Sequence, residues 1–169
     1  VARLCAGSYA IELYRLIVPE EVADPAVFGW LAGFMERWEH DLPDPADLAA
    51  EEMALLDLLG HAPRLDACVT CGKVAPDRAW GRFDPAAGGL VCRACGSGRT
   101  GTVRVGSRVR AFLTAVARPG QGAAGRGSDA HDRVLVDAKA LRDCMDGYVR
   151  AIAEREPRSM RSLRRAWGM

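Results

Sequence analysis

The stretch Cys68-Val69-Thr70-Cys71-Gly72 decides how this chain is organised, and it is matched after a gap of 20 residues by Cys92-Arg93-Ala94-Cys95-Gly96. A Cys-x-x-Cys turn aims two thiolates at one point, so two such pairs offer four ligands to a tetrahedral metal ion. The glycine after each pair can adopt a left-handed backbone conformation without steric cost. The spacing therefore predicts one structural Zn²⁺ held by Cys68, Cys71, Cys92 and Cys95.

Two other roles for these cysteines compete with zinc, namely two disulfides and a redox dithiol. Val1 to Leu4 show no charged and apolar leader, and a chain of 169 residues can bury a core without disulfides. A redox pair normally opens a helix after a strand, which we expect of neither pair. A catalytic zinc is disfavoured because four thiolates leave no position for water.

Between the cysteine pairs, residues 80–85 and 88–91 are expected to form two short strands and a turn, the body of a zinc ribbon. The fold class predicted for the chain is mainly α, a helical bundle with an inserted four-cysteine zinc ribbon made of two short β-hairpins. We expect an acidic helical part over 1–66, the ribbon over 67–98, and a basic helical part over 99–169.

The composition, 49% hydrophobic and 27% charged, is that of a soluble globular protein. No apolar run reaches the length of about 18 residues that a membrane-spanning helix needs. Six cysteines that include a metal set fit a reducing, cytoplasmic location. Because the first residue is valine, the chain is expected to be a fragment or a processed product.

Charge is distributed unevenly along the sequence. Residues 1–67 carry 4 basic and 13 acidic side chains, and residues 68–169 carry 19 basic and 9 acidic ones. This asymmetry has two interpretations, and the sequence supports them about equally. The basic part could meet an acidic partner such as nucleic acid or an acidic peptide, or the two parts could neutralise one another.

Two helices are predicted at the start of the chain, over 8–18 and 24–38. Ser8 is expected to cap the first, and Asp24 followed by proline at the first helical position is typical of a helix start. Apolar residues recur at steps of three and four along the second helix, which predicts a buried stripe of Val27, Phe28, Leu31, Phe34, Met35 and Trp38.

A third helix is predicted over 46–59, ended by Gly60. Its apolar side is expected to be buried, and its polar side to consist of Asp47, Glu51, Glu52 and Asp57. After the ribbon, further helices are predicted from Ser107, from Asp137 to Pro157, and over 158–167. Their predicted buried residues are Val109, Phe112, Leu113, Val116, Leu141, Cys144, Met145, Tyr148, Val149, Ile152, Met160, Leu163 and Trp167.

Several residues that resemble functional groups have simpler expected roles. His61 follows the third helix and is expected to be a turn residue, while Cys5 and Cys144 are expected to be small buried hydrophobes. The glycine-rich run 119–128 lacks the strand and the Gly-Lys-Ser/Thr ending of a phosphate loop and is expected to be a surface loop. No Ser-His-Asp set or nucleotide fingerprint is present, so an enzyme is not predicted.

The basic part offers candidate contacts for DNA or for an acidic partner. These contacts are arginines near the fourth predicted helix and in the C-terminal tail, although an ordinary solvated arginine face is the competing interpretation. The candidates are Arg104, Arg108, Arg110, Arg158, Arg161, Arg164 and Arg165.

Three stretches resemble a known family. They are Leu55-Leu56-Asp57-Leu58-Leu59-Gly60-His61-Ala62-Pro63-Arg64-Leu65 leading to the first cysteine pair, Gly88-Gly89-Leu90-Val91-Cys92-Arg93-Ala94-Cys95, and the ending Arg158-Ser159-Met160-Arg161-Ser162-Leu163. Together they resemble the C-terminal portion of the RecO family of bacterial recombination mediators, over about Tyr9 to Arg165.

The resemblance implies a helical domain with an inserted zinc ribbon and no enzymatic activity. It implies binding of single- and double-stranded DNA, annealing of complementary strands, and a bacterial, cytoplasmic and nucleoid-associated location. The implied partners are RecR and the acidic tail of single-stranded-DNA-binding protein, with which the family helps load RecA. The family begins with an OB-fold, which is expected to be absent from this chain. The alternative expectation is a zinc-ribbon protein-interaction module with no direct DNA contact.

Overall fold

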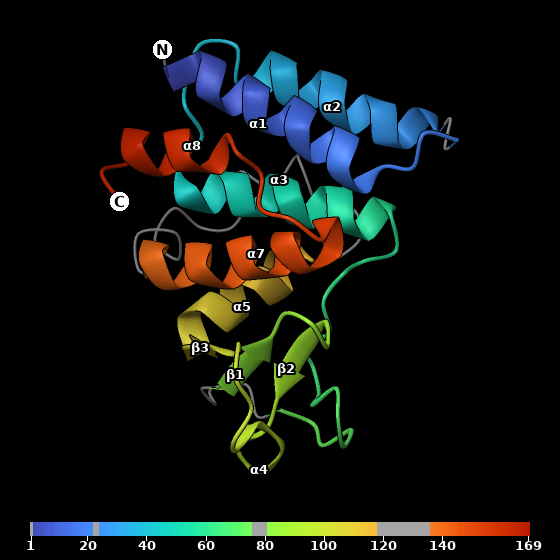
Figure 1. The fold of residues 1–169 in the computed structure, drawn as a ribbon, viewed down its shortest axis with the longest axis vertical. Coiled ribbons are helices and arrows are strands. Elements are labelled where there is room, and N and C mark those ends of the chain that lie inside the picture. The colour runs from blue at the N-terminus through green and yellow to red at the C-terminus, as the bar shows by residue number, and fades with distance from the viewer. Residues whose placement is uncertain (1, 22–23, 76–80, 118–135) are drawn as a thin grey trace.

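The structure, a computed structural model, describes residues 2–21, 24–75, 81–117 and 136–169. Its helices lie across the long axis of the molecule and stack from α1 and α2 at one end, through α8, α3 and α7, to a small sheet at the other end (Figure 1). The elements are α1 (Ala2–Ile17), α2 (Pro25–Arg37), α3 (Pro45–Leu58), β1 (Gly81–Asp84), β2 (Gly89–Val91), α4 (Arg93–Gly96), β3 (Val103–Val105), α5 (Ser107–Val116), α7 (Ala138–Ala153) and α8 (Met160–Ala166).

Local signals set the ends of α2 and α3 as predicted. The Asp24 carboxylate accepts from the backbone N–H of Ala26 at 2.7 Å, with proline at the first helical position of α2. Gly60 ends α3 with φ of 74°, and the N–H of His61 donates to the Leu56 carbonyl at 2.7 Å. This left-handed glycine and its backward hydrogen bond satisfy the last carbonyls of α3.

Helix α3 is the centre of the molecule, with α2, α5 and α7 packed around it. Its apolar residues Leu48, Met53 and Leu55 are fully buried, as predicted. The predicted polar side is wrong at two positions, because Glu51 and Glu52 are also buried. A helix with neighbours on several sides has no continuous solvent face, so its carboxylates must find partners inside the protein.

The Glu52 carboxylate lies in a buried ionic network that joins four helices. Arg142 of α7 donates to both Glu52 oxygens at 2.8 and 2.9 Å, and the Tyr9 hydroxyl of α1 donates to Oε1 at 2.5 Å. Asp146 accepts from Arg142 and also from Arg164 of α8. The network connects α1, α3, α7 and α8 through charge-assisted hydrogen bonds.

The first two helices differ from the prediction in detail. Helix α1 begins at Ala2, so Ser8 lies inside the helix and does not cap it. On α2, Val27 and Phe34 are buried as predicted, but Phe28 and Met35 are 63% and 42% exposed.

Trp30 takes an inward position that the predicted stripe of α2 omitted. It is buried, and its indole N–H donates to the Glu51 carbonyl at 2.9 Å. The buried stripe of α2 is therefore rotated relative to the predicted one, and part of the predicted stripe faces outward.

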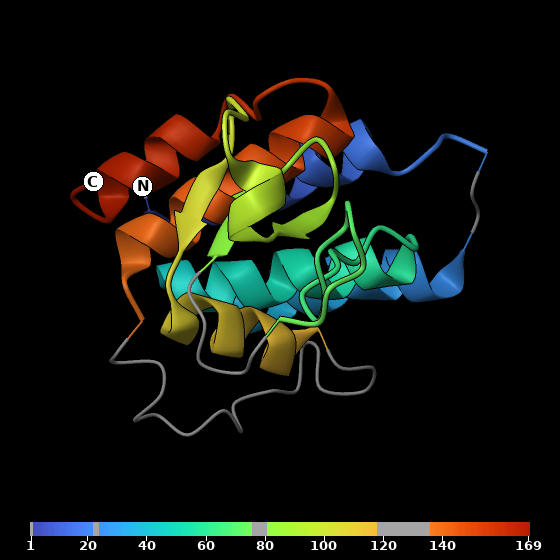
Figure 2. The same cartoon turned by 90° about the horizontal axis from the view of Figure 1, so that it is seen from below.

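The sheet has three antiparallel strands in the order β2-β1-β3. Two of them are the predicted strands, and β3 was not predicted. Phe83 of β1 pairs with Leu90 of β2 and Val103 of β3. The Phe83 ring meets the Tyr148 ring of α7 edge-on at 5.4 Å, and Phe83, Leu90 and Val105 belong to the main hydrophobic core. The sheet is therefore packed directly on the helices (Figure 2).

The C-terminal helices largely follow the prediction. Asp137 caps α7 by accepting from the Ala140 N–H, and the predicted inner residues of α5 and α7 are buried except for Ile152, which is half-buried. Helix α7 ends at Ala153, where Glu154 adopts a left-handed φ of 57°, and does not continue to Pro157.

In α8 the predicted inner residues Met160 and Leu163 are buried, and half-buried Trp167 donates to the Pro43 carbonyl at 2.9 Å. No helix in the described ranges is long and apolar enough to cross a membrane. The first residue of the predicted strand 80–85 and the predicted loop 119–128 lie outside the described residues.

Candidate metal centre

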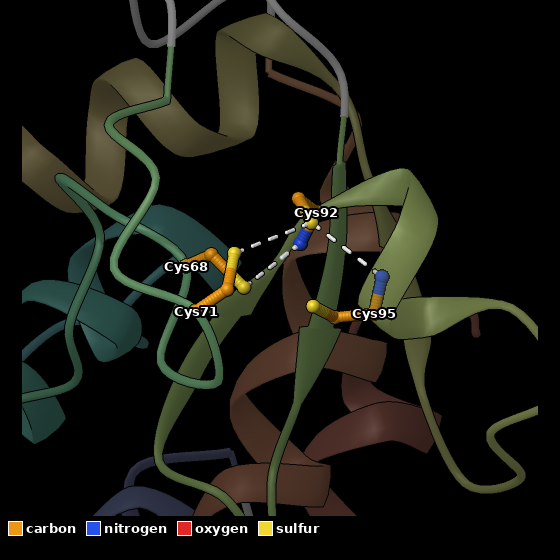
Figure 3. Close-up of side chains that lie close together, drawn as sticks. All are labelled: Cys68, Cys71, Cys92 and Cys95. Carbon is orange, nitrogen blue, oxygen red and sulfur yellow. Dashed lines mark hydrogen bonds between the residues drawn. The ribbon is translucent and has the colours of Figure 1, made fainter.

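Four cysteine sulfurs converge at the end of the sheet (Figure 3). Cys68 and Cys71 come from a turn after α3, and Cys92 and Cys95 come from the end of β2 and from α4. Their sulfur atoms all lie within 4.8 Å of one another, so the four could hold one metal ion.

The sulfur spacing fits a metal centre better than disulfides. Sulfurs bound tetrahedrally at about 2.3 Å from one zinc ion are about 3.8 Å apart. The Cys71 and Cys92 sulfurs are 3.8 Å apart, whereas a disulfide needs about 2.05 Å. All four thiols are free of disulfide bonds.

The first cysteine pair lies in a tight turn of the predicted kind. The Cys68 N–H donates to the Lys73 carbonyl, and the Gly72 N–H donates to the Cys68 carbonyl, both at 2.9 Å. Gly72 has a left-handed φ of 72°, which confirms the predicted role of the glycine that follows this pair.

The second cysteine pair is built differently, and two expectations about it are wrong. Gly96 lies in α4 and does not have a left-handed backbone conformation. A Cβ atom at this position would lie 3.2 Å from Arg82 Cδ, so a larger residue would disturb the packing against Arg82. Cys92 also follows β2 and caps α4, so this pair does open a helix after a strand. The helix has only four residues, and the first cysteine pair lies beside it.

Backbone N–H groups prepare the cluster for anionic sulfur. Burial raises the pKa of the Cys68 thiol, but hydrogen bonds from the backbone N–H groups of Cys92, Cys71 and Thr70 outweigh it and lower the pKa to about 6. The Cys92 N–H lies 3.3 Å from the Cys68 sulfur. The Cys95 N–H likewise lowers the pKa of Cys92. Thiolate is the form that binds metal, so these N–H groups favour a bound cation at Cys68 and Cys92. The neighbouring thiols of Cys92 and Cys71 instead raise the pKa of Cys95 to about 12.

Arg110 supports the first cysteine pair from inside the protein. It is buried, and its guanidinium donates to the carbonyls of Leu65 and Ala75, on either side of the pair, both at 3.0 Å. This burial disfavours its predicted role as a DNA or acidic-partner contact. An arginine is normally exposed, and no signal in the sequence distinguishes Arg110 from Arg108 two residues earlier, which is exposed.

The structure does not bring the other candidate arginines together. Arg104 is exposed on β3 and Arg108 in the first turn of α5, near the sheet. Arg158, Arg161 and Arg165 are exposed in or just before α8, which lies among the helices away from the sheet (Figure 1). Arg164 is partly buried and ion-paired with Asp143 and Asp146.

The remaining residues that resemble functional groups have structural positions. His61 lies in the turn that ends α3, as expected, and its carbonyl accepts from the Tyr148 hydroxyl at 2.7 Å. Cys144 is fully buried, and burial raises the pKa of its thiol to about 12, which makes it unreactive. Cys5 is only half-buried against the core.

Comparison with known proteins gives one concordant picture. The family described as "Recombination protein O C terminal" matches residues 1–156. The chain is similar to proteins named DNA repair protein RecO. It is 36% identical to the one from Myxococcus xanthus over 88 residues, which cover 52% of this chain and 35% of that protein. It is 34% identical to the one from Geobacter sulfurreducens over 96 residues, which cover 57% of this chain and 39% of that protein. The match in Pelobacter propionicus is 36% over 114 residues (67% and 46%).

These matches cover only part of the longer relatives. The chain spans between a third and a half of the length of the three curated relatives given above. No solved structure matches the chain.

Proposed function

Because the chain belongs to the recombination protein O family, matching its C-terminal domain over residues 1–156, we propose that it acts in DNA repair and homologous recombination. The family match is the observation that carries the proposal, and it is supported by relatives named DNA repair protein RecO. The protein is a mediator and not an enzyme: it binds DNA, promotes annealing of complementary strands and, with RecR, helps load RecA onto DNA coated by single-stranded-DNA-binding protein. Its location is the bacterial cytoplasm, at the nucleoid.

The metal that we propose for the cysteine cluster is a single structural Zn²⁺, held by Cys68, Cys71, Cys92 and Cys95. Four thiolates are a ligand set that zinc prefers, and they close its tetrahedral shell against water. Bound zinc would supply a cross-link between the turn after α3 and α4. The strands of the sheet have only three or four residues each, so the ribbon needs such support.

The exposed face of α8 is the surface that we propose for an acidic partner, the tail of single-stranded-DNA-binding protein. Arg161 and Arg165 lie four residues apart and so share one side of α8. Half-buried Trp167 follows at the end of α8, and Met169 is 42% exposed. A peptide with acidic and apolar side chains would find both kinds of contact there.

A protein-interaction module without direct DNA contact is the second candidate function. It is favoured by exposed apolar side chains on α1 and α2, the two helices at the end of the molecule opposite the sheet (Figure 1). Leu4 is 75% exposed and Phe28 is 63% exposed. Exposed apolar groups of this size are typical of docking surfaces when they are contiguous.

Salt dependence of DNA binding separates the two candidates. Fluorescence anisotropy of a labelled 30-base single strand and of its duplex would be measured with the zinc-loaded chain from low to moderate salt. Several phosphate contacts predict a steep linear fall of log affinity with log salt, because each contact releases counterions. A slope near zero, or no binding at the lowest salt, would favour the protein-interaction module.

A further inference from the structure

A groove of about 600 Å³ lies beside the metal centre, on the side of the sheet formed by β1 and β3. The described residues that line it belong to β1, α4, β3 and the loop after α4, and they are arginines, glycines and one serine. Its four arginines are Arg82, Arg93, Arg99 and Arg104. We call this feature the arginine groove.

Two of these arginines face each other across a strand pair. Arg82 of β1 and Arg104 of β3 are register partners in the antiparallel ladder, so their side chains leave the same face of the sheet side by side. Like charges placed directly opposite each other destabilise a sheet. Two guanidinium groups on one face of the sheet can donate to a single anion that lies between them.

The contacts of Arg82 do not neutralise its charge, whereas Arg99 has an acidic partner. Arg82 donates to the side-chain and backbone oxygens of Thr102, which are uncharged. Arg99 pairs with Asp84 at 2.5 Å and donates to Thr70. Arg93 is exposed on α4, between two of the metal-centre cysteines. The groove therefore presents positive charge on a scaffold that the sheet and the cysteine cluster hold in place.

We propose that the arginine groove binds phosphodiester groups of a DNA backbone. The planar fork of an arginine donates two parallel hydrogen bonds to a phosphate. Glycines at Gly81, Gly96 and Gly98 leave the backbone accessible at the groove wall. An acidic peptide fits less well, because the described part of the lining offers no apolar side chain to receive a peptide's own side chains. The proposal rests on the proposed function, in which this domain contacts DNA.

The test compares two double variants of the zinc-loaded chain that remove the same charge. Arg93→Gln with Arg104→Gln changes two exposed arginines of the groove, and Arg161→Gln with Arg165→Gln changes two exposed arginines of α8. Anisotropy with the labelled duplex and single strand gives the salt slope of each protein. Zinc content and the far-UV circular dichroism spectrum show whether metal and fold are retained, since Arg93 could also offset the negative charge of a zinc–thiolate centre.

We expect the groove variant to lose two phosphate contacts. Its log–log salt slope should decrease by about 1.8 on duplex and about 1.4 on single strand. The loss should not depend on base sequence, because phosphate contacts carry no base information. The α8 variant should keep the parent slope.

The possible failures are distinguishable. If the parent chain binds DNA and the groove variant keeps the parent slope, the groove is not the site, and the proposed function stands. Equal decreases in both variants would show a general charge effect and would also overturn the groove. If the parent chain binds no DNA at low salt, direct DNA contact by this domain fails together with the groove.

Discussion

Arg142 and Glu52 are both fully buried, and each is the other's principal partner. Burial alone would raise the pKa of Glu52, and the Arg142 guanidinium opposes that change by stabilising the carboxylate. Trp167 lies 5.8 Å from the same guanidinium. A buried ion pair adds little net stability, because both charges lose their hydration on folding. Removing one partner is costly, because the remaining charge is then buried with neither water nor a counter-ion.

Replacing Arg142 alone should therefore strongly destabilise the folded protein. We expect Arg142→Met to lower the free energy of unfolding by roughly 3–5 kcal/mol, since it leaves Glu52 buried without a counter-ion. Urea denaturation followed by circular dichroism measures the change. The double variant Glu52→Leu with Arg142→Met should recover most of the loss. Arg150→Met, an exposed position on the same helix, serves as control and should be near neutral.

At the scale of elements, the ribbon depends on two kinds of support. One end carries the cysteine cluster, and the other is packed on the helices through the Phe83–Tyr148 contact and buried Leu90 and Val105. The cluster joins segments that are otherwise turns and a four-residue helix. The metal should therefore govern order near the cysteines more than order in α3 and α7.

Metal removal should loosen one part of the molecule selectively. After treatment with a zinc chelator, we expect amide hydrogen exchange to accelerate over residues 68–75 and 89–99, because these backbones lose their cross-link. Amides of α3 and α7 should keep most of their protection. Uniform acceleration over the whole chain would show that the helices also need the metal. Unchanged exchange near the cysteines would show that the metal does not stabilise the ribbon.

The Glu12 carboxylate of α1 accepts several hydrogen bonds from the start of α8. Glu12 accepts hydrogen bonds from the N–H groups of Arg158 and Ser159 at 2.8 and 2.9 Å and from the Ser159 hydroxyl at 2.5 Å. Burial raises the pKa of Glu12, but these hydrogen bonds outweigh it and place the pKa below its ordinary value of 4.5. The bonds favour the ionised form in the folded protein.

This attachment predicts a pH-dependent contribution. A carboxyl group whose pKa is lowered on folding stabilises the protein above its unfolded pKa and loses that effect as pH falls through the folded pKa. The stability difference between the parent chain and Glu12→Gln should thus be largest near neutral pH and shrink below pH 4.5. Urea midpoints across this range measure it. A difference that does not change with pH would mean that the charge of Glu12 is not involved.

For the whole molecule, the charge asymmetry of the sequence is not simply cancelled in the fold. Arg142–Glu52 joins the acidic and basic parts, but Arg37–Glu51 lies within the first part and Arg164–Asp146 within the second. The exposed arginines of the sheet and of α8 lie in different parts of the molecule (Figure 1). This separation favours two separate binding surfaces for anionic partners, one at the sheet and one at α8.

The shared hydrophobic core predicts a single unfolding event. Residues of the sheet and of helices α1, α2, α3, α5, α7 and α8 belong to one buried cluster, so we expect the zinc-loaded chain to melt in one transition, with calorimetric and van't Hoff enthalpies that agree. Differential scanning calorimetry tests this. Two resolved transitions would show that the ribbon folds independently of the helices.

Local chemistry explains which features could be predicted from the sequence. Asp24, Gly60 and the four cysteines act through their own turn or cap, and all lie in the expected positions. Glu52 and Arg110 could not be assigned, because each is buried by partners 35 or more residues away. Their residue types point to solvent, and only the packing of several helices shows that they are enclosed.

The link between Glu52 and Arg142 has a consequence for how the chain forms on the ribosome. Synthesis is vectorial, and 90 positions separate the two residues. Until α7 emerges from the exit tunnel, the first three helices contain a carboxylate whose cationic partner does not yet exist, and the turn around Cys68 lacks Arg110 until α5 is made. We expect nascent chains that stop before residue 142 to remain open to proteases, and compact folding to follow only when α7 has been translated.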